Sequence, residues 1–187
     1  MIEVEIKVAV NDSLQIEEKL LQLGFGKEDL LKETDYYFDS KFNKLREHDK
    51  ALRIRSCENL TSNTAEHFMT FKGPKLDSIS MTRKELEMKI ESAETGIEIL
   101  CSLGYEPVLP VRKLRQYLAM GEITACLDQV EGLGDFLELE IIVPQESERE
   151  AALNQVITLL HELGYAPDEI IRTSYLSMLQ RKSKETI

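Results

Sequence analysis

Residues 3–7 (EVEIK), 85–89 (ELEMK) and 138–142 (ELEII) share a pattern in which two glutamates flank one apolar residue. Side chains two residues apart in a β-strand point to the same face of the sheet. Each segment therefore predicts a strand with two carboxylates on one face and aliphatic side chains on the other. Adjacent like charges destabilise a sheet, so we expect cationic groups to lie between these carboxylates.

A helix is expected after each of these strands, because the chain returns three times to a Leu-Gly-aromatic ending, at 23–25, 103–105 and 163–165. A glycine directly after the last helical turn is a common way to end a helix. Asp12 or Ser13 can cap the first helix and Ser92 the second, while Ser147 and Glu150 have the spacing of a capping box. The predicted helices cover about 13–23, 92–103, 147–163 and 173–181.

The rest of the chain predicts further strands with short connections. They cover about 34–39, 51–57, 67–72, 113–120 and 123–130, in addition to strands over 1–10, 82–90 and 136–143. Gly73-Pro74 is expected to break a strand, and the polar stretches 58–66 and 75–80 are expected to be mobile loops. We expect a single domain over residues 1–187, with a frayed tail at about 183–187.

Composition limits the classes of protein to which the chain can belong. With 187 residues, 42% of them hydrophobic and 30% charged, the chain suits one soluble domain with a substantial core. The net charge of −11 argues against a nucleic-acid-binding surface, although it allows an internal basic site. Three cysteines without a C-x-x-C pair, and the lack of an apolar run or a leader-like start, predict a cytoplasmic protein that binds no membrane.

Charged residues recur at alternating positions in nearly every predicted strand. One interpretation is an open sheet with a solvated charged face and helices on its other face. Because both signs occur in similar number across about seven strands, a second interpretation is favoured, in which the sheet closes into a barrel and the charges line its lumen. Arginine and lysine bind phosphate oxygens, and carboxylates hold Mg²⁺ or Mn²⁺ that bridges to phosphates. The pattern therefore predicts a metal-dependent phosphate or polyphosphate site inside a barrel.

The chain resembles the CYTH superfamily, the triphosphate tunnel metalloenzymes. The resemblance begins with the E-x-E-x-K of residues 3–7 and continues through 71–74 (FKGP), 113–115 (KLR), Asp128, 132–138 and 172–175 (RTSY). It implies an α+β fold, a closed eight-stranded antiparallel β-barrel with helices packed on the outside. The KLR strand, the GLGDF turn and the terminal Ser-Tyr are most similar to the class IV adenylate cyclase branch.

The resemblance also implies the roles of the charged residues. It gives Glu3, Glu5 and Glu138 as metal ligands, with Glu140 as an accessory. The expected triphosphate clamp consists of Lys7, Arg53, Arg55, Lys72, Arg83, Lys113 and Arg115. The acids Glu85, Glu87 and Asp128 are expected to orient these bases or to hold a second metal ion. Of the clamp, Lys113 and Arg115 are expected to act with these three acids in catalysis.

Three functions fit this site. The first is a class IV adenylate cyclase-like enzyme that converts ATP into cyclic AMP and pyrophosphate with Mg²⁺ or Mn²⁺. The second is a triphosphatase acting on thiamine triphosphate, inorganic triphosphate or a nucleoside triphosphate, and the third is a non-catalytic polyphosphate or nucleotide binding module. Tyr36, Tyr37 and Phe38 could face a purine, although aromatic residues at strand spacing usually belong to a core. A homodimer is a further expectation.

Overall fold

Strand β1 (Ile2–Val10) shows how the alternating sequence builds the sheet. Its residues Val4, Ile6 and Val8 are at most 1% exposed and belong to the main hydrophobic core. The intervening charged side chains line the interior of the barrel. Strand β1 pairs antiparallel with β9 (Gly134–Val143), which places Glu5 opposite Glu140. Two of the three Glu-x-Glu segments are therefore direct neighbours.

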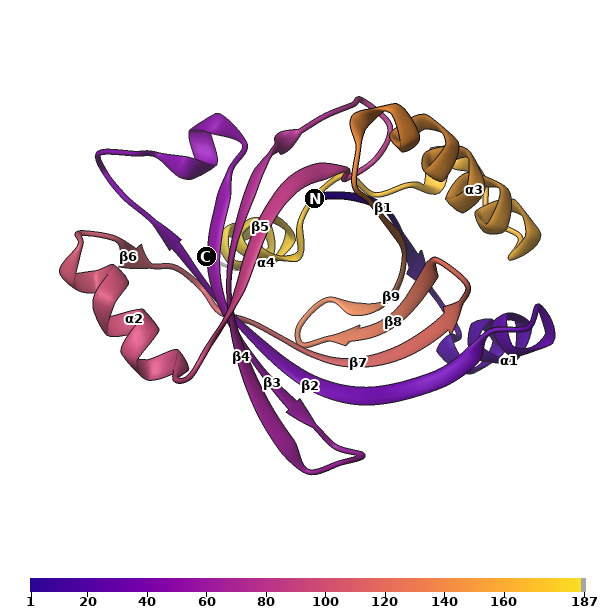
Figure 1. Ribbon diagram of the computed structural model, residues 1–187, viewed down its shortest axis with the longest axis horizontal. Coiled ribbons are helices and arrows are strands. Elements are labelled where there is room, and N and C mark those ends of the chain that lie inside the picture. Colours follow the sequence, from indigo (N-terminus) through magenta and orange to yellow (C-terminus); the bar gives the residue numbers. More distant parts are fainter. Residues whose placement is uncertain (186–187) are drawn as a thin grey trace.

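The computed structural model, which describes residues 1–185, shows a closed barrel of eight antiparallel strands (Figure 1). Around the barrel the order is β3-β4-β5-β1-β9-β8-β7-β2, and a pairing between β2 and β3 closes it. The two-residue strand β6 (Glu106–Pro107) adds to the edge of β2. The other strands are β2 (Gly26–Asp39), β3 (Ala51–Asn59), β4 (Thr64–Lys75), β5 (Arg83–Ile90), β7 (Val111–Met120) and β8 (Ile123–Val130). The predicted α+β barrel is confirmed.

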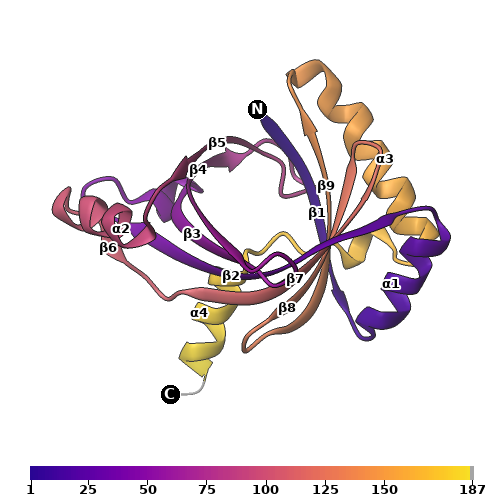
Figure 2. The same cartoon turned by 60° about the horizontal axis from the view of Figure 1, so that its bottom comes forward.

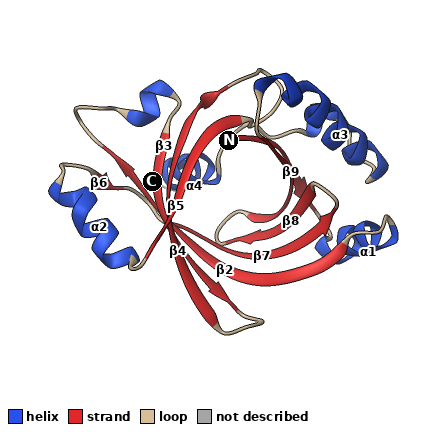
Figure 3. Ribbon diagram, viewed as in Figure 1, coloured by secondary structure: helices blue, strands red, loops and turns tan. Residues whose placement is uncertain are grey.

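Four α-helices of the described chain lie outside the barrel wall (Figure 3). Helices α1 (Ser13–Gln22) and α3 (Arg149–Glu162) cover one side, and α2 (Ala93–Ser102) covers the opposite side. Helix α4 (Tyr175–Glu185) sits at one end of the barrel (Figure 2). Short 3₁₀ turns at Leu45–His48, Glu146–Glu148 and Pro167–Glu169 complete the set.

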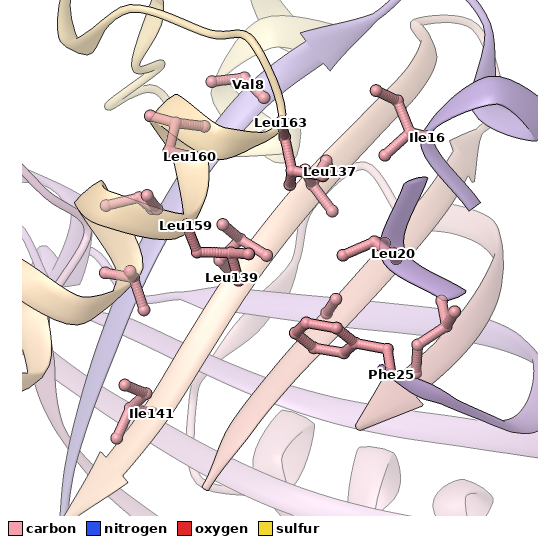
Figure 4. Close-up of a cluster of buried hydrophobic side chains, with 14 of the residues drawn as sticks. Val8, Ile16, Leu20, Phe25, Leu137, Leu139, Ile141, Leu159, Leu160 and Leu163 are labelled. Atoms are coloured by element: carbon pink, nitrogen blue, oxygen red, sulfur yellow. The ribbon is translucent and has the colours of Figure 1, made fainter. Parts of the chain in front are cut away.

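The main core lies between α1, α3 and the outer face of the barrel (Figure 4). Leu20 of α1 is fully buried, and Leu160 and Leu163 at the end of α3 are each 1% exposed. They pack against aliphatic residues of β1 and β9 such as Leu139. A smaller cluster centred on Ile54 packs beneath α2. Helices thus bury the apolar faces of β1, β9 and β3, whereas Leu86 and Met88 on the outer face of β5 are exposed.

The predicted N-terminal caps are confirmed for α1 and α2, and the capping box predicted for α3 is wrong. Asp12 and Ser92 cap α1 and α2 by accepting hydrogen bonds from backbone amides. The capping box expected from Ser147 is absent from the described structure, since α3 begins at Arg149 after a 3₁₀ turn and has no side-chain cap. Gly164, which ends α3, has a φ of 96° and so needs the conformational freedom of glycine.

Both stretches expected to be mobile loops are more ordered than predicted. Residues 58–66 form the hairpin between β3 and β4, and Gly73-Pro74 lies inside β4, where a register shift absorbs it. The 75–80 stretch is held by Arg149, which pairs with Asp77 at 3.1 Å, and by Arg172, which donates to a backbone carbonyl of this loop. Long-range partners therefore order segments whose composition alone suggests mobility.

The C-terminal tail expected to fray at about 183–187 is only partly described. Residues 183–185 belong to α4, and residues 186–187 lie outside the described part of the chain. Among residues 1–185, no helix combines the length and the apolar character needed to cross a bilayer.

Candidate active site

A cavity of about 530 Å³ occupies the barrel interior, and residues of α4 form part of its lining. Its volume lies within the range of about 300–1,000 Å³ that is typical of small-molecule sites. The structure brings nearly all the residues predicted for the site to this one cavity. Its walls include Glu3, Glu5, Lys7, Arg53, Arg55, Lys72, Arg83, Glu85, Glu87, Lys113, Arg115, Glu138 and Glu140.

Three carboxylates of the cavity wall form a compact group. Glu3, Glu5 and Glu140 each offer an oxygen, and these oxygens all lie within 4.8 Å of one another. The register of β1 against β9 causes this approach, since Glu5 stands opposite Glu140. The accessory residue Glu140, rather than Glu138, is thus the third member of the group. Oxygen ligands at this spacing suit a hard divalent cation such as Mg²⁺ or Mn²⁺.

The protonation of this group reflects its crowding. Burial, together with the charges of Glu138 and Glu3, raises the pKa of Glu5 to about 7. Burial and the charge of Glu3 likewise raise the pKa of Glu140 to about 8. For Glu3 burial also acts to raise the pKa, but Lys72 and the hydrogen bonds around it bring the pKa down to about 2. The group favours a bound proton or a bound cation over three free charges.

Glu138 lies among bases instead. Its carboxylate is 3.5 Å from the Lys7 ammonium and contacts the Arg115 guanidinium, and only 7% of its side chain is exposed. Despite burial, Arg115 and Lys7 hold the pKa of Glu138 well below its usual value. Arg115 also approaches Glu140 at 3.5 Å, so it links Glu138 to the carboxylate group. In this structure Glu138 therefore fixes bases beside the carboxylates.

Asp128 is the one predicted site residue that does not line the cavity. Its carboxylate is buried on the inner face of β8, where it accepts hydrogen bonds from Lys113 at 3.0 Å and from two nitrogens of Arg115 at 2.5 and 2.6 Å. Tyr175 donates a fourth, at 2.9 Å. Asp128 thus contacts both bases, and its role in orienting them stays a prediction.

The middle Glu-x-Glu pair also contacts bases and their neighbours. Lys72 lies between Glu3, at 3.0 Å, and Glu85, which it contacts directly. Glu87 accepts a hydrogen bond from Thr70 at 2.8 Å, and Thr70 in turn accepts one from Arg53 at 3.4 Å. Burial raises the pKa of Glu85 to about 8 despite Lys72. Arg83 lines the cavity near its mouth, where it donates to the backbone carbonyl groups of Asp49 and Gly73.

Two acidic residues of the site were missed from the sequence. Asp35 accepts two hydrogen bonds from Arg55, at 2.6 and 2.8 Å, and one from Arg53 at 3.3 Å. Glu33 lies 3.1 Å from Arg55 and 3.3 Å from Lys113. Glu33, Asp35 and Tyr37 alternate along β2, and this signal could have revealed them. Much of the basic charge expected for the clamp is therefore already balanced.

Tyr175 connects α4 with the lumen. Its ring lies 4.3 Å below the Lys7 ammonium and 5.5 Å from that of Lys113, distances at which a cation is attracted to an aromatic face. Phe136 packs against its edge, with ring centroids 5.0 Å apart. Tyr175 belongs to the RTSY stretch of residues 172–175, but its contacts with Lys7 and Lys113 could not be predicted from the sequence.

The protein is a closed barrel with acids and bases on its inner face. Residues 1–175 match the CYTH domain family. The chain belongs to the CYTH domain family. Among its CYTH relatives, "Putative adenylate cyclase MJ0240" of Methanocaldococcus jannaschii is 42% identical over 178 residues, covering 95% of this chain and 98% of that protein. "Adenylate cyclase CyaB" of Aeromonas hydrophila is 28% identical over 149 residues, covering 80% of this chain and 73% of that protein.

A solved CYTH-like structure confirms the fold. The PH1819 protein of Pyrococcus horikoshii OT3 superposes with a TM-score of 0.87 and is 36% identical, with 96% of this chain and 99% of that chain covered.

Proposed function

We propose that this CYTH protein is a metal-dependent enzyme acting on a triphosphate in its barrel lumen, and that its reaction is the conversion of ATP into cyclic AMP and pyrophosphate. One observation carries the proposal. The Glu3, Glu5 and Glu140 oxygens lie within 4.8 Å of one another on the wall of a cavity that also carries Lys7, Lys72 and Arg115. Carboxylates alone suit a cation, and bases alone suit an anion, but their combination suits a polyphosphate that carries a divalent cation.

The carboxylate group fits a divalent cation on chemical grounds. Burial, followed by the charges of the neighbouring glutamates, raises the pKa of Glu5 to about 7 and that of Glu140 to about 8, and a bound cation would offset both effects. Glu3, Glu5 and Glu140 would hold Mg²⁺ or Mn²⁺, and Glu138 remains our prediction as a further ligand. When bound, the metal supplies charge neutralisation for the phosphate chain.

The bases of the lumen bind and orient the phosphates. Lys7 is held from below by the Tyr175 ring, 4.3 Å away, and Lys113 and Arg115 are held by Asp128. These residues are fixed before substrate arrives, so little reorganisation is needed when charge develops on the leaving pyrophosphate. Arg53, Arg55, Lys72 and Arg83 complete the proposed clamp. No covalent nucleophile is required, because positioning and charge neutralisation drive phosphoryl chemistry of this kind.

The names of two relatives support the choice of cyclase, since both are named as adenylate cyclases. A triphosphatase would use the same clamp but direct water at the terminal phosphorus. The two reactions differ in their products, and this difference provides the test.

The experiment incubates the purified protein with ATP, thiamine triphosphate or tripolyphosphate in Mg²⁺ or Mn²⁺ and follows the products by phosphorus NMR. We expect pyrophosphate and a cyclic nucleotide from ATP. Orthophosphate and ADP from ATP, with neither pyrophosphate nor cyclic nucleotide, would replace the cyclase by the triphosphatase. Failure to bind or turn over any of the three would contradict the proposal as a whole.

We further propose a cytoplasmic location, supported by three cysteines that are all free. The net charge of −11 gives no support to a nucleic-acid partner. A homodimer stays a prediction.

A further inference from the structure

The end of the cavity near α4 differs from the rest of the lumen. Around Glu3, Glu5 and Lys72 the walls are charged, whereas Tyr37 of β2, Val108 and Leu176 of α4 bring an aromatic ring and aliphatic side chains to the same cavity. Tyr37 and Leu176 belong to one partly buried apolar cluster beside Tyr175. Tyr36 and Phe38, by contrast, belong to the core beneath α2. The lumen thus has a charged part and, at α4, a more apolar part that also carries Ser177 and Arg181.

A polar atom without a partner lies at this apolar end. Gln180, on the same helix as Leu176, lines the cavity, and its Oε1 atom is shielded from solvent and has no hydrogen-bond partner among the described residues. A buried carbonyl oxygen that makes no hydrogen bond is unfavourable, so its presence calls for a partner that the described residues do not supply. A carboxamide next to apolar walls favours a flat ligand with a hydrogen-bonding edge.

We propose that Tyr37, Leu176 and Gln180 form a subsite for an adenine base, with the Gln180 carboxamide hydrogen-bonded to the edge that carries the 6-amino group. Gln180 Oε1 accepts from that amino group, and the Nε2 group donates to the adjacent ring nitrogen, a pairing that the glutamine side chain makes with adenine elsewhere. The Tyr37 ring and Leu176 provide apolar surface for the faces of the base. This inference rests on the proposed function and names the part of the substrate that a triphosphate clamp leaves undefined.

The placement suits a nucleoside triphosphate. The subsite and the carboxylate group line one continuous cavity, so a single ligand can occupy both with its base at α4 and its phosphates among the bases. Tripolyphosphate fills only the charged part and gains nothing at α4. The subsite therefore predicts a preference for ATP over ligands that lack the base or its amino group.

The test measures binding of ATP, purine riboside 5′-triphosphate and tripolyphosphate in Mg²⁺ by thermophoresis, with phosphorus NMR to verify that each ligand is intact. Purine riboside triphosphate differs from ATP only by the missing 6-amino group. We expect the wild-type protein to bind ATP about tenfold more tightly than this analogue, the effect of one lost hydrogen bond to a buried group. In Gln180→Met, which keeps the side-chain length, we expect that preference to disappear while tripolyphosphate binds as before. Lys184→Met, on the exposed part of the same helix, serves as the matched control.

The outcomes separate the subsite from the function on which it rests. Equal wild-type affinity for ATP and the analogue would overturn the subsite, and so would a preference that survives in Gln180→Met. In both cases tripolyphosphate binding would leave the triphosphate function standing. If the wild-type protein bound none of the three ligands, the proposed function itself would fail. Because the wild-type comparison uses no variant, poor folding of Gln180→Met would not prevent a decision.

Discussion

Tyr175 donates its hydroxyl hydrogen bond to Oδ2 of Asp128 at 2.9 Å, and so joins the first turn of α4 to the carboxylate that orients Lys113 and Arg115. The same tyrosine ring lies under the Lys7 ammonium. One residue at the C-terminal end of the chain therefore supports bases that come from β1 and β7. The helix at the end of the barrel contributes to the site as well as covering it.

Substitution of Tyr175 tests these two contacts separately. Tyr175→Phe removes the hydroxyl group but keeps the ring under Lys7, so we expect a loss of about 1 kcal/mol in unfolding free energy and a weakened but measurable turnover. Tyr175→Leu also removes the cation–π contact, and we expect a clearly larger rise in KM for the triphosphate. Urea denaturation and steady-state kinetics measure both effects. Tyr165→Phe, after the end of α3, is the control; equal effects of all three changes would refute this positioning role.

Removal of one carboxylate from the group of Glu3, Glu5 and Glu140 should have opposite effects on activity and on the stability of the metal-free protein. In Glu5→Gln and Glu140→Gln we expect metal-dependent turnover to fall by roughly 100-fold or more, because charge neutralisation worth several kcal/mol is lost. Without metal, and at a pH above the raised pKa values of about 7 and 8, the same variants should melt at a higher temperature than the wild type, since a repelled charge has gone. Turnover assays and thermal melts with and without Mg²⁺ measure these effects.

Glu138→Gln provides a contrast to those variants. We also expect it to abolish metal-dependent turnover, but it leaves Lys7 and Arg115 without their carboxylate and should lower the melting temperature in the absence of metal. Glu122→Gln, on the exposed turn between β7 and β8, should change neither property. Unchanged turnover in both Glu5→Gln and Glu138→Gln would refute the site assignment.

The stability of the metal-free protein should fall as the pH rises from about 5 to about 8.5. The raised pKa values, about 7 for Glu5 and about 8 for Glu140, mean that the native state keeps protons that the unfolded chain has already released. Rising pH removes this advantage as it passes through the native pKa values, with a total loss of several kcal/mol. The lowered pKa of Glu3, about 2, acts only at more acidic pH. Urea denaturation at several pH values tests this, and Mg²⁺ should restore stability most strongly at the alkaline end; a curve that rises with pH would contradict it.

It could be predicted from the local sequence that the charged residues of a strand share one face. In a strand the period of two fixes the face, so Glu3, Glu5 and Lys7 must share one side once β1 is recognised. The sequence did not predict a strand over the first part of β2, before residue 34. Residues 26–33 (GKEDLLKE) show no clean alternation, and their strand conformation comes from pairing with β7 and, near their end, β3. Glu33 was therefore missed.

The identity of the third carboxylate required long-range information. Glu138 and Glu140 lie on the same face of β9, and sequence cannot tell which of them approaches β1 at Glu5. The register places Glu140 opposite Glu5 and Glu138 opposite Lys7. A shift of two residues would place Glu138 opposite Glu5 and Phe136 opposite Lys7, and would leave every strand prediction unchanged. Local pattern defines the set of site residues, and the pairing of distant strands assigns their neighbours.

The buried ion pairs around Asp35 provide the last prediction. Asp35 is 2% exposed and accepts a two-point hydrogen bond from Arg55, so Asp35→Asn removes the ion-pair partner of buried Arg53 and leaves Arg55 with Glu33 alone. Loss of one partner of such a pair costs about 3–5 kcal/mol. The exposed pair of Lys32 and Glu58, 3.6 Å apart, offers a matched control on the same two strands, and Glu58→Gln should cost less than about 0.5 kcal/mol. Urea denaturation compares the two variants. If Asp35→Asn lowered the unfolding free energy as little as Glu58→Gln does, the stability of the barrel would not depend on the ion pairs of Asp35 with Arg53 and Arg55. These two bases would then be free to bind phosphate with their full charge.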